Sequence, residues 1–531
     1  MSNTETELKL RLTDSTCLER LLHMPLLQQL SDQPPNTQTL ETTYYDTTDH
    51  RLLLAGLSYR LRLANGQWTA TVKADGSSDG GLHRRTEFNA SADGRCPSIV
   101  PFLATDIGER LAAAAGEMSL EPIFSTRFER HIVNIVAPDG SSIELALDDG
   151  IILAGDKQQP ILELELELKA GQPQSLLWLG AALAQEFPLL PEQNSKLYRA
   201  IQLAGLAAGL GKDKPQPSPL KKSNASLPAG QVLSQIIIYH IQKVICAQQA
   251  YLSELDDDPE PLHNLRISLR RLRSLLSFAK PLLPKTEYSD RQSGLADWNR
   301  QLGQARNLDV LAAAWDELND YMSELLPNQA IKPTLTTILA DKRQQVRAET
   351  YNAVASGQIT PVLLGLWSFI EAWRIEELQP PCPDLKEFAE ERLAYRLKQL
   401  LKRGSSLVLT DCQSAHELRI AAKNIRYALE ALAPILQNNS KLLCKRLEKL
   451  QDLLGSIQDI TLTLSLLQQL VKASASRLAH RDAGLITGWQ LAKSTAAAGK
   501  WVKVWTKTEK AAGKFKKLHS PTPRYPQKKE S

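Results

Sequence analysis

The sequence has few cysteines and no long apolar run. Its six cysteines, at positions 17, 96, 246, 382, 412 and 444, are scattered without any C-x-x-C pair. Neither a disulfide framework nor a zinc site is therefore predicted. No window approaches the apolar length that spans a bilayer, and the acidic N-terminal segment does not resemble a signal peptide. These absences favour a cytoplasmic protein without a membrane partner.

Familiar patterns of nucleophilic catalysis and nucleotide binding are also missing. There is no evident Ser-His-Asp or Cys-His set, and the Gly-rich segment 75–81 fits neither a Walker A loop nor a dinucleotide fingerprint. We expect that segment to be a flexible loop. The 531 residues, 43% apolar and 23% charged, indicate a soluble globular protein of two or three domains.

The net charge of +4 hides a difference between the two halves of the chain. Residues 1–210 contain 17 Lys and Arg against 27 Asp and Glu, a net charge of −10. Residues 211–531 contain the remaining 46 against 32, a net charge of +14. The first half would need cations, whereas the second would attract polyanions.

Charged residues alternate with leucines in the first predicted strand, residues 5–12. Its odd positions are charged, and Leu8, Leu10 and Leu12 form the other face. The same alternation returns in later segments, where each of the following sets shares one face: Arg60 and Arg62; Thr71 and Lys73; Arg85 and Glu87; Glu144 and Asp148; Glu163, Glu165 and Glu167.

Strands of this kind can close into a barrel with a polar interior, which brings carboxylates and cations together. Clustered carboxylate oxygens suit Mg²⁺ or Mn²⁺, and convergent Arg and Lys suit phosphate oxygens. The pattern therefore predicts a site for a polyanion with a metal. The alternative is an ordinary sheet with a solvated charged face.

From residue 231 onward the apolar pattern has a period of 3.6 and contains an internal repeat. The segment His263-Asn-Leu-Arg266 returns 153 positions later as His416-Glu-Leu-Arg419. Both copies carry basic residues at offsets 0, 3, 7 and 10, which form one stripe of a helix. Each copy is followed by a Leu-Gly pair, at 302–303 and 454–455. Two related helical bundles are the predicted architecture.

A basic stripe on a helix is often only a solvated face. Two stripes with identical spacing in a basic domain favour phosphate binding instead, because forked guanidinium donors match phosphate oxygens. Apolar stripes should bury both helices, through Leu265, Leu269, Leu272 and Leu276 in the first copy and Leu418, Ala422, Ile425 and Leu429 in the second.

The N-terminal motif Glu5-x-Glu7-x-Lys9 resembles the opening of the CYTH superfamily, the triphosphate tunnel metalloenzymes. The resemblance continues in order over residues 1–205, through the segments 44–46, 60–62, 71–73, 85–87, 125–127, 144–148, 163–165 and 195–196. It implies an α+β fold with an antiparallel β-barrel tunnel and a metal-dependent inorganic triphosphatase. That enzyme would hydrolyse triphosphate to pyrophosphate and phosphate.

The resemblance also implies roles for individual residues. Lys9 would orient Glu5, Glu7 or a phosphate. The predicted catalytic residues are Glu5, Glu7 and Lys9. The predicted substrate-binding residues are Arg60, Arg62, Lys73, Arg85, Arg127 and Lys196. The predicted ligands of Mg²⁺ or Mn²⁺ are Glu5, Glu7, Asp148, Glu163 and Glu165.

The helical half is similar to the CHAD domain, a module linked with inorganic polyphosphate. This resemblance covers 231–518 and departs from the family at Asn307, where the family usually has Asp, so that Asp309 alone remains. It predicts a linker over 206–230, an all-α domain over 231–518 and a disordered tail over 519–531. The predicted polyphosphate-binding residues are His263, Arg266, Arg270, Arg273, His416, Arg419, Lys423 and Arg426.

Two alternative functions stay open at this point. Relatives with this tunnel act on thiamine triphosphate, nucleoside triphosphates or RNA 5′ ends, or as adenylate cyclases. A protein of another class would be a non-catalytic scaffold that binds polyphosphate. Nucleic acid ranks below polyphosphate as a partner, because no aromatic residues are interleaved with the basic stripes.

Overall fold

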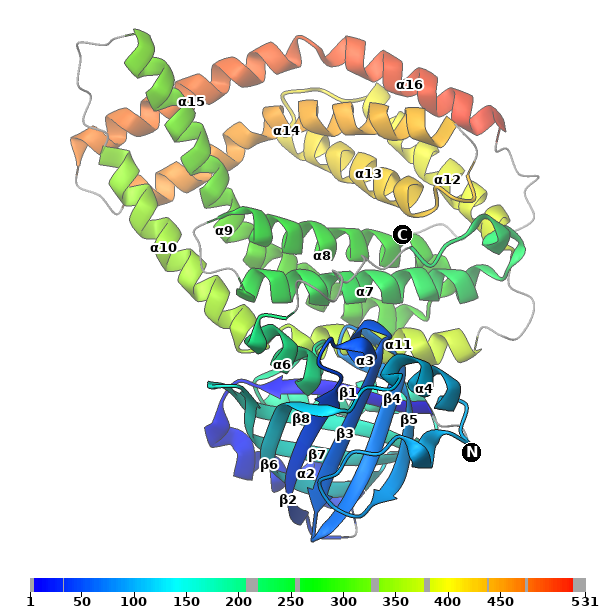
Figure 1. Ribbon diagram of the computed structural model, residues 1–531. Helices are drawn as coiled ribbons and strands as arrows, with labels where there is room; N and C mark the ends of the chain where they lie inside the picture. The colour runs from blue at the N-terminus through cyan, green and yellow to red at the C-terminus, as the bar shows by residue number, and fades with distance from the viewer. Residues whose placement is uncertain are drawn as a thin grey trace. The chain divides into compact units, whose positions relative to one another are not determined.

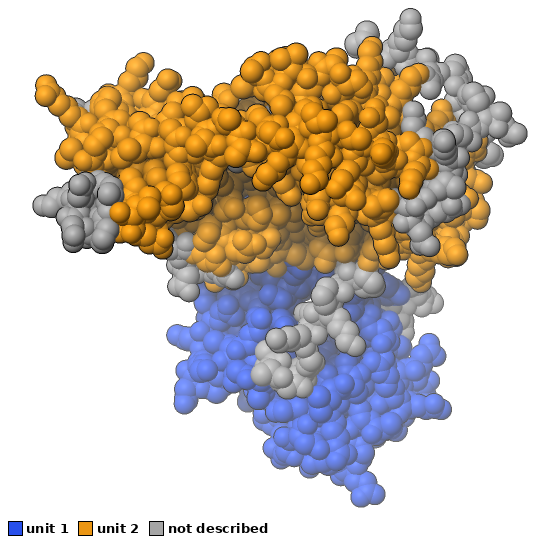
Figure 2. Space-filling view, turned by 90° about the horizontal axis from the view of Figure 1, so that it is seen from above, with its two compact units in different colours: residues 1–217, 353–369 blue, residues 218–352, 370–531 orange. Residues whose placement is uncertain are grey.

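The chain divides into two compact units in the computed structural model, which describes residues 4–31, 33–206, 218–253, 258–325, 334–376, 383–436, 439–472 and 476–518. Unit 1 comprises residues 1–217 and 353–369, and unit 2 comprises 218–352 and 370–531, as coloured in Figure 2. The segment 353–369 therefore clusters with the N-terminal unit, although its sequence lies within the helical half. The predicted tail over 519–531 lies outside the described residues.

Unit 1 is a closed antiparallel β-barrel of eight strands, with a short ninth strand added (Figure 1). The strand order is β5-β4-β3-β2-β6-β7-β8-β1-β9, and the additional pairing of β1 with β5 closes the barrel. The strands are β1 (Thr4–Leu12), β2 (Asn36–Asp46), β3 (Leu57–Ala64), β4 (Gln67–Asp79), β5 (Leu82–Ala92), β6 (Glu121–Val136), β7 (Ser142–Ala154), β8 (Lys157–Ala170) and β9 (Leu189–Pro191).

The predicted alternation sorts charge to the inside of the barrel and leucine to the outside. Leu8 and Leu10 of β1 are fully buried beneath α5 (Pro173–Glu186), where Gly180 lets the helix approach closely. Leu364 of α11 (Thr360–Glu376) packs at the same point. The remaining helices of unit 1 are α1 (Leu18–Leu22), α2 (Pro25–Leu30), α3 (Arg51–Leu54), α4 (Gly108–Ala115) and α6 (Lys196–Ala204).

Apolar side chains fill one end of the barrel interior. Phe124 and Phe128 of β6 share a strand face with Thr126 and pack with Ala200 and Ile201 of α6. Helix α6 contacts β6, β7 and β8, so it closes the barrel at that end.

Residues 75–79 of the Gly-rich segment belong to a strand rather than to the predicted flexible loop, and Gly80 and Gly81 form a turn. Strand β4 runs to Asp79, and its register with β5 shifts between Ala74 and Ser77. A Cβ at Gly76 would lie 2.9 Å from Nε of Arg85. The glycine therefore makes room for the arginine, which explains the composition without invoking a mobile loop.

Unit 2 consists of helices, as predicted for the C-terminal half. The described part of the predicted linker contains a 3₁₀ helix, Lys222–Ser226, and is followed by α7 (Ala229–Ser253). The other helices in this part of the chain are α8 (Glu260–Ala279), α9 (Lys285–Leu325), α10 (Thr334–Ala355), α12 (Leu385–Ser405), α13 (Cys412–Ala431), α14 (Asn439–Lys472), α15 (Arg477–Ala498) and α16 (Trp501–Leu518); the first residues of α11 belong to unit 1.

The internal repeat has a structural counterpart. Helices α7, α8 and α9 correspond to α12, α13 and α14, and each helix contacts its own equivalent. Such self-pairing is the arrangement expected around a two-fold axis. Both predicted apolar stripes are buried, from Leu265 to Leu276 in α8 and from Leu418 to Leu429 in α13, and each basic stripe lies on a neighbouring face of its helix.

Among the described residues, no single helix is long and apolar enough to cross a bilayer. One bent pair, residues 334–355 and 360–374, meets the criteria of length and composition only when the two helices are counted together.

Candidate functional site

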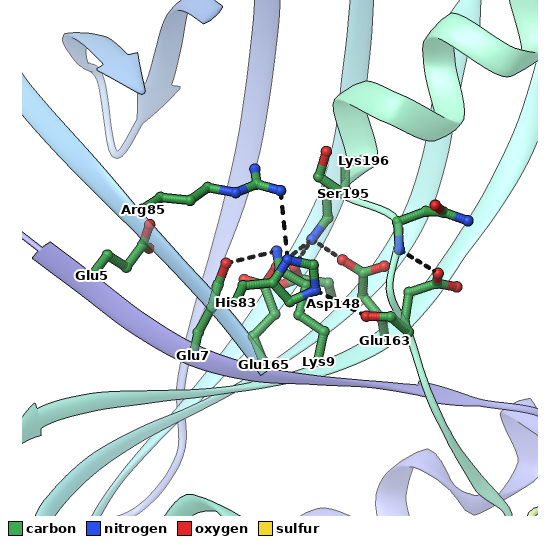
Figure 3. Close-up of polar contacts among 12 residues, drawn as sticks. Glu5, Glu7, Lys9, His83, Arg85, Asp148, Glu163, Glu165, Ser195 and Lys196 are labelled. Atoms are coloured by element: carbon green, nitrogen blue, oxygen red, sulfur yellow. Dashed lines mark hydrogen bonds and ion pairs between the residues drawn. The ribbon is translucent and has the colours of Figure 1, made fainter. Parts of the chain in front are cut away.

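The barrel interior holds a small polar cavity of about 60 Å³. Carboxylates and cations from six strands and α6 converge on it, some of them drawn in Figure 3. Its charged lining residues are Glu5, Glu7, Lys9, Arg60, Arg62, Lys73, Arg85, Arg130, Glu165, Glu167 and Lys196.

The deepest charges form a buried cluster of three carboxylates. Oxygens of Asp148, Glu163 and Glu165 lie within 4.8 Å of one another. Lys196 donates to all three, at 2.7 Å to Asp148 and 3.0 Å to Glu165, with the third contact to Glu163. Arg130 adds Nη2–Oδ2 and Nη2–Oε2 contacts of 2.7 and 2.5 Å to Asp148 and Glu165. Asp148 and Glu163 are therefore paired with cations of the chain, whereas Glu165, although also paired, lines the cavity.

Lys196 owes its position to the start of α6. Ser195 caps this helix by accepting a hydrogen bond from the backbone N–H of Tyr198, which fixes the first helical residue at the barrel wall. Burial would lower the pKa of Lys196, but Asp148 and Glu163 raise it above the ordinary value. Lys196 thus remains an ammonium group in the dry interior.

A second group of charges lies along β1. Lys73 Nζ bridges Glu5 and Glu87, at 2.6 and 2.5 Å, and Lys9 contacts Glu7 at 3.2 Å. Burial, only partly offset by Lys73, raises the pKa of Glu5 to about 7. A further cation at this point would favour the charged form of Glu5.

The cations on the opposite wall have weaker partners. Arg62 Nε donates to Thr42 Oγ1 at 3.1 Å, and Arg60 lies 3.7 Å from Glu87. Burial, together with Arg60 and Arg130, lowers the pKa of Arg62 to about 9. An anion bound at this wall would relieve the repulsion between these guanidinium groups.

His83 is fully buried beside Arg85 (Figure 3). Its Nε2 lies 2.9 Å from the backbone oxygen of Glu192, and its Nδ1 lies 3.5 Å from Arg85 Nη2. Burial, and then Lys9, lowers the pKa of His83 to about 3. The ring is thus neutral, donates from Nε2 and offers Nδ1 as an acceptor to Arg85.

The donor set fits a hard divalent cation. The cavity lining includes the carboxylates of Glu5, Glu7, Glu165 and Glu167, and such oxygens are the preferred ligands of Mg²⁺ and Mn²⁺. After burial, Glu7 and Glu87 also contribute to the raised pKa of Glu5, and a cation bound beside Glu5 would lower that pKa. Asp148 and Glu163, which were also predicted as ligands, lie behind this layer in ion pairs with Lys196.

One predicted substrate-binding residue faces the wrong way. The Arg127 side chain is 71% exposed and lies 3.8 Å from Glu41 on the outer surface, so its predicted role in the tunnel is wrong. Arg130, three positions later, faces the interior and was missed. The even positions Phe124, Thr126 and Phe128 were the signal, because they share the face of Arg130. Glu87 and Glu167 were likewise absent from the predicted site.

Unit 2 contains a much larger cavity, of about 1360 Å³. The two basic stripes of α8 and α13 converge on it, together with Arg306 of α9, which the sequence did not single out. The lining includes all eight predicted residues: His263, Arg266, Arg270, Arg273, His416, Arg419, Lys423 and Arg426. Asp309 is not among its lining residues but is paired with Arg343 and Arg347.

The cations in this cavity repel one another. Burial, then Arg270 and Arg306, lowers the pKa of Arg266 to about 10. Burial, then Arg270 and Arg419, lowers the pKa of Lys423 to about 7. Among the described residues, the Nε atoms of Arg266, Arg270 and Arg273 lack hydrogen-bond partners. A polyanion would supply acceptors and relieve the repulsion.

Both halves of the chain match known families. Residues 3–201 match the CYTH domain and residues 235–468 match the CHAD domain. An inorganic triphosphatase from Haemophilus influenzae is 34% identical over 206 residues, which are 38% of this chain and 54% of the relative. The chain thus matches about half the length of that relative.

Solved structures resemble each half. The CHAD domain from the plant Ricinus communis is 24% identical, with a TM-score of 0.46, over 56% of this chain and 97% of its own. A Hippeastrum protein described as an adenylyl cyclase with a dominant triphosphatase activity is 19% identical, with a TM-score of 0.28, over 38% of this chain and 99% of its own.

Proposed function

Because this chain joins a CYTH domain to a CHAD domain, we propose that it is a metal-dependent inorganic triphosphatase with a polyphosphate-binding module. The observation that carries the proposal is the barrel cavity, where carboxylates on β1 and β8 face guanidinium groups on β3. One closed site thus offers ligands for a divalent cation and donors for phosphoryl oxygens.

Within this proposal, Glu5, Glu7 and Glu165 hold Mg²⁺ or Mn²⁺, with Asp148 and Glu163 fixing the cations behind them. The metal ion, when bound, neutralises charge on the substrate and lowers the barrier to attack by water. Phosphoryl transfer needs positioning and charge neutralisation more than covalent help. That chemistry requires no covalent nucleophile from the chain.

The substrate would replace carboxylates as the partner of cations in the cavity. Arg60, Arg62 and Arg85 would bind phosphoryl oxygens, and Lys73 would exchange its contacts with Glu5 and Glu87 for the substrate. Lys196 and Lys9 would keep their carboxylate partners and orient them. The apolar packing around α6 excludes water from that end, so each retained charge contact is strengthened.

Hydrolysis itself needs a water oxygen to bond to the terminal phosphorus while the bridging P–O bond breaks. The electron pair of that bond leaves with pyrophosphate, and guanidinium donors stabilise the negative charge that develops. Thiamine triphosphate and nucleoside triphosphates share this chemistry, so the same cavity is compatible with the broader class of triphosphatases. Its volume of about 60 Å³ favours a compact substrate.

The test is phosphate release from triphosphate, pyrophosphate, ATP and long-chain polyphosphate with Mg²⁺ or Mn²⁺. We expect triphosphate to be the best substrate, and Glu7→Gln to reduce kcat about 10²-fold or more, because it removes a carboxylate ligand. Glu129→Gln, on the exposed side of β6, is the matched control. A folded Glu7→Gln variant that retains most of its activity would show that Glu7 is not a ligand of the metal ion.

The large cavity of unit 2 supports the second part of the proposal. Its basic stripes and its volume suit an extended polyanion, and no catalytic pair is evident in its lining. We expect polyphosphate to bind there without hydrolysis. Affinity should fall with salt, with a log–log slope of about −4 if six cations neutralise phosphates, at about 0.7 per contact.

Binding should be measured on the full chain in EDTA, since residues 353–369 belong to unit 1 and an excised module would lose them. The double variant Arg270→Glu, Lys423→Glu should abolish binding. Salt-independent binding, or a double variant that binds like the parent, would show that the basic stripes are solvated helix faces and do not bind polyphosphate. Binding of that double variant combined with full triphosphatase activity would indicate that polyphosphate is held elsewhere.

A further inference from the structure

Each basic stripe has one arginine whose guanidinium group lies over a glycine of a neighbouring helix. Arg266 of α8 lies over Gly303 of α9, and Arg419 of α13 lies over Gly455 of α14. Both arginines occupy the second position of their stripe, and both glycines belong to the repeated Leu-Gly pair. The two contacts are therefore equivalent in the repeat.

At Gly455 there is no room for a side chain beneath Arg419. A Cβ built at Gly455 would lie 2.8 Å from Nη2 of Arg419, 3.1 Å from Cζ and 3.5 Å from Nε. Carbon and nitrogen atoms do not approach to 2.8 Å without repulsion. Because the atoms at risk are the end of a flexible side chain, an added methyl group would displace the guanidinium and leave the helix backbone in place.

The corresponding contact at Gly303 is looser. A Cβ there would lie 3.7 Å from Nη2 of Arg266 and 3.9 Å from its Cζ and Nε. These are ordinary van der Waals distances. One methyl group would be accommodated at Gly303 but not at Gly455, and this difference supplies an internal control.

Both arginines line the large cavity, and both glycines are buried inside long helices. Glycine in the middle of a helix is less favourable than alanine, so its presence at both equivalent positions calls for a local reason. Close helix packing would be one reason. At Gly455 and Gly303, however, the nearest atoms outside the helix are those of the arginine side chains.

We propose that Gly455 is a positioning residue, which seats the guanidinium group of Arg419 against α14 so that its donors face the bound polyanion, while the looser contact at Gly303 serves as the internal comparison. This inference deepens the proposed polyphosphate-binding function and rests on it. Gly455 touches no ligand itself, since it acts through Arg419.

The first experiment measures polyphosphate affinity of the full chain in EDTA, together with Tm. Gly455→Ala should weaken binding about tenfold or more, the scale of a lost charged hydrogen bond, without lowering Tm. Gly303→Ala should change affinity less than about twofold, because its contact distances are ordinary. Gly484→Ala and Gly488→Ala in α15 are matched controls, since nothing lies within 4 Å of a Cβ there.

A double-mutant cycle separates positioning from packing. If Gly455 acts through Arg419, then Gly455→Ala should have no further effect on affinity in an Arg419→Ala background. A loss that persists in that background, or a Tm that falls together with affinity, would show that the glycine serves helix packing and would overturn the inference.

A second measurement does not depend on polyphosphate. In a crystal structure of ligand-free Gly455→Ala, the Arg419 guanidinium should have left its place over α14, while Arg266 in Gly303→Ala should be unmoved. An unmoved Arg419 would refute the positioning role. If the parent protein fails to bind polyphosphate, the proposed ligand is wrong, and this structural comparison still decides whether the glycine seats the arginine.

Discussion

Lys423 should make polyphosphate binding depend on pH above neutrality. Its ammonium group faces Arg266 and Arg270 from α8 and Arg419 and Arg426 from its own helix, in a cavity to which α14 contributes Asp452 and α9 contributes Arg306. Burial first, and then these arginines, lowers its pKa to about 7 from an ordinary 10.5. Among the described residues, Lys423 has no ion pair with a carboxylate.

The size of the effect follows from that difference. A pKa that moves from 10.5 to about 7 corresponds to roughly 5 kcal/mol of unfavourable charging at about 1.4 kcal/mol per unit. Since the unfolded chain keeps the proton between pH 7 and 10.5, stability of the free protein should rise with pH across that window. Below pH 7 the lysine is charged in both states, and the full cost is present.

A bound polyanion should offset the cost of charging Lys423, so that the lysine binds its proton again in the complex. At pH 8 the free protein holds Lys423 largely neutral, so binding should take up about 0.9 proton if Lys423 is fully protonated in the complex. Affinity should accordingly fall as pH rises through 7 and above. Lys423→Arg, which stays charged at every pH, should bind with a flatter pH profile.

The assay is isothermal titration calorimetry at pH 8 in two buffers of different ionisation enthalpy, which counts the protons taken up. Comparing the parent with Lys423→Met isolates this group from His263, whose pKa burial and Arg306 also lower. Lys423→Met should take up about 0.9 proton fewer and should be more stable at neutral pH. Equal proton uptake by parent and variant would refute the reasoning.

Three further predictions concern the barrel. Arg62→Lys should raise KM for triphosphate about tenfold with the metal dependence unchanged, because a point charge cannot replace a bidentate fork; equal loss of metal affinity would contradict this. In urea unfolding, Arg130→Met should cost roughly 3–5 kcal/mol by stranding buried carboxylates, whereas Arg127→Ala should change stability by less than about 0.5 kcal/mol; similar costs would refute the assignment of faces. His83→Leu should reduce activity, whereas His83→Gln should retain most of it. In the pH profile of the parent's activity, His83 should cause no inflection near pH 6, because burial lowers its pKa to about 3.

The strands and stripes were predictable because their periods are set by backbone geometry. The alternation in β1 and β8 fixed which side chains share a face, and the structure confirms that Leu8, Leu10, Leu164 and Leu166 form a buried face. The helical repeat likewise predicted buried leucines in α8 and α13, which is confirmed. In both cases a local rule was enough, since no distant contact was needed to apply it.

Sequence alone did not locate features that depend on distant contacts. The motif around Arg127 suggested the wrong face, because one position decides between inside and outside in a strand. The glycines of segment 75–81 indicated a loop, whereas Gly76 makes room for Arg85 within a strand. The packing of α11 against α5 near Gly180 connects positions far apart in the chain and had no local signal.

The two cavities treat charge in opposite ways, and this difference explains their proposed division of labour. In the barrel, Lys73 and Lys196 are held by carboxylates before any substrate arrives. A substrate must therefore compete with those carboxylates, and only a compact, highly charged anion supported by a metal ion gains enough from the exchange. In the helical cavity, Arg266 and Lys423 face other cations instead. Any linear polyanion that spans both stripes would relieve that repulsion, so length and charge rather than exact shape should decide what binds there.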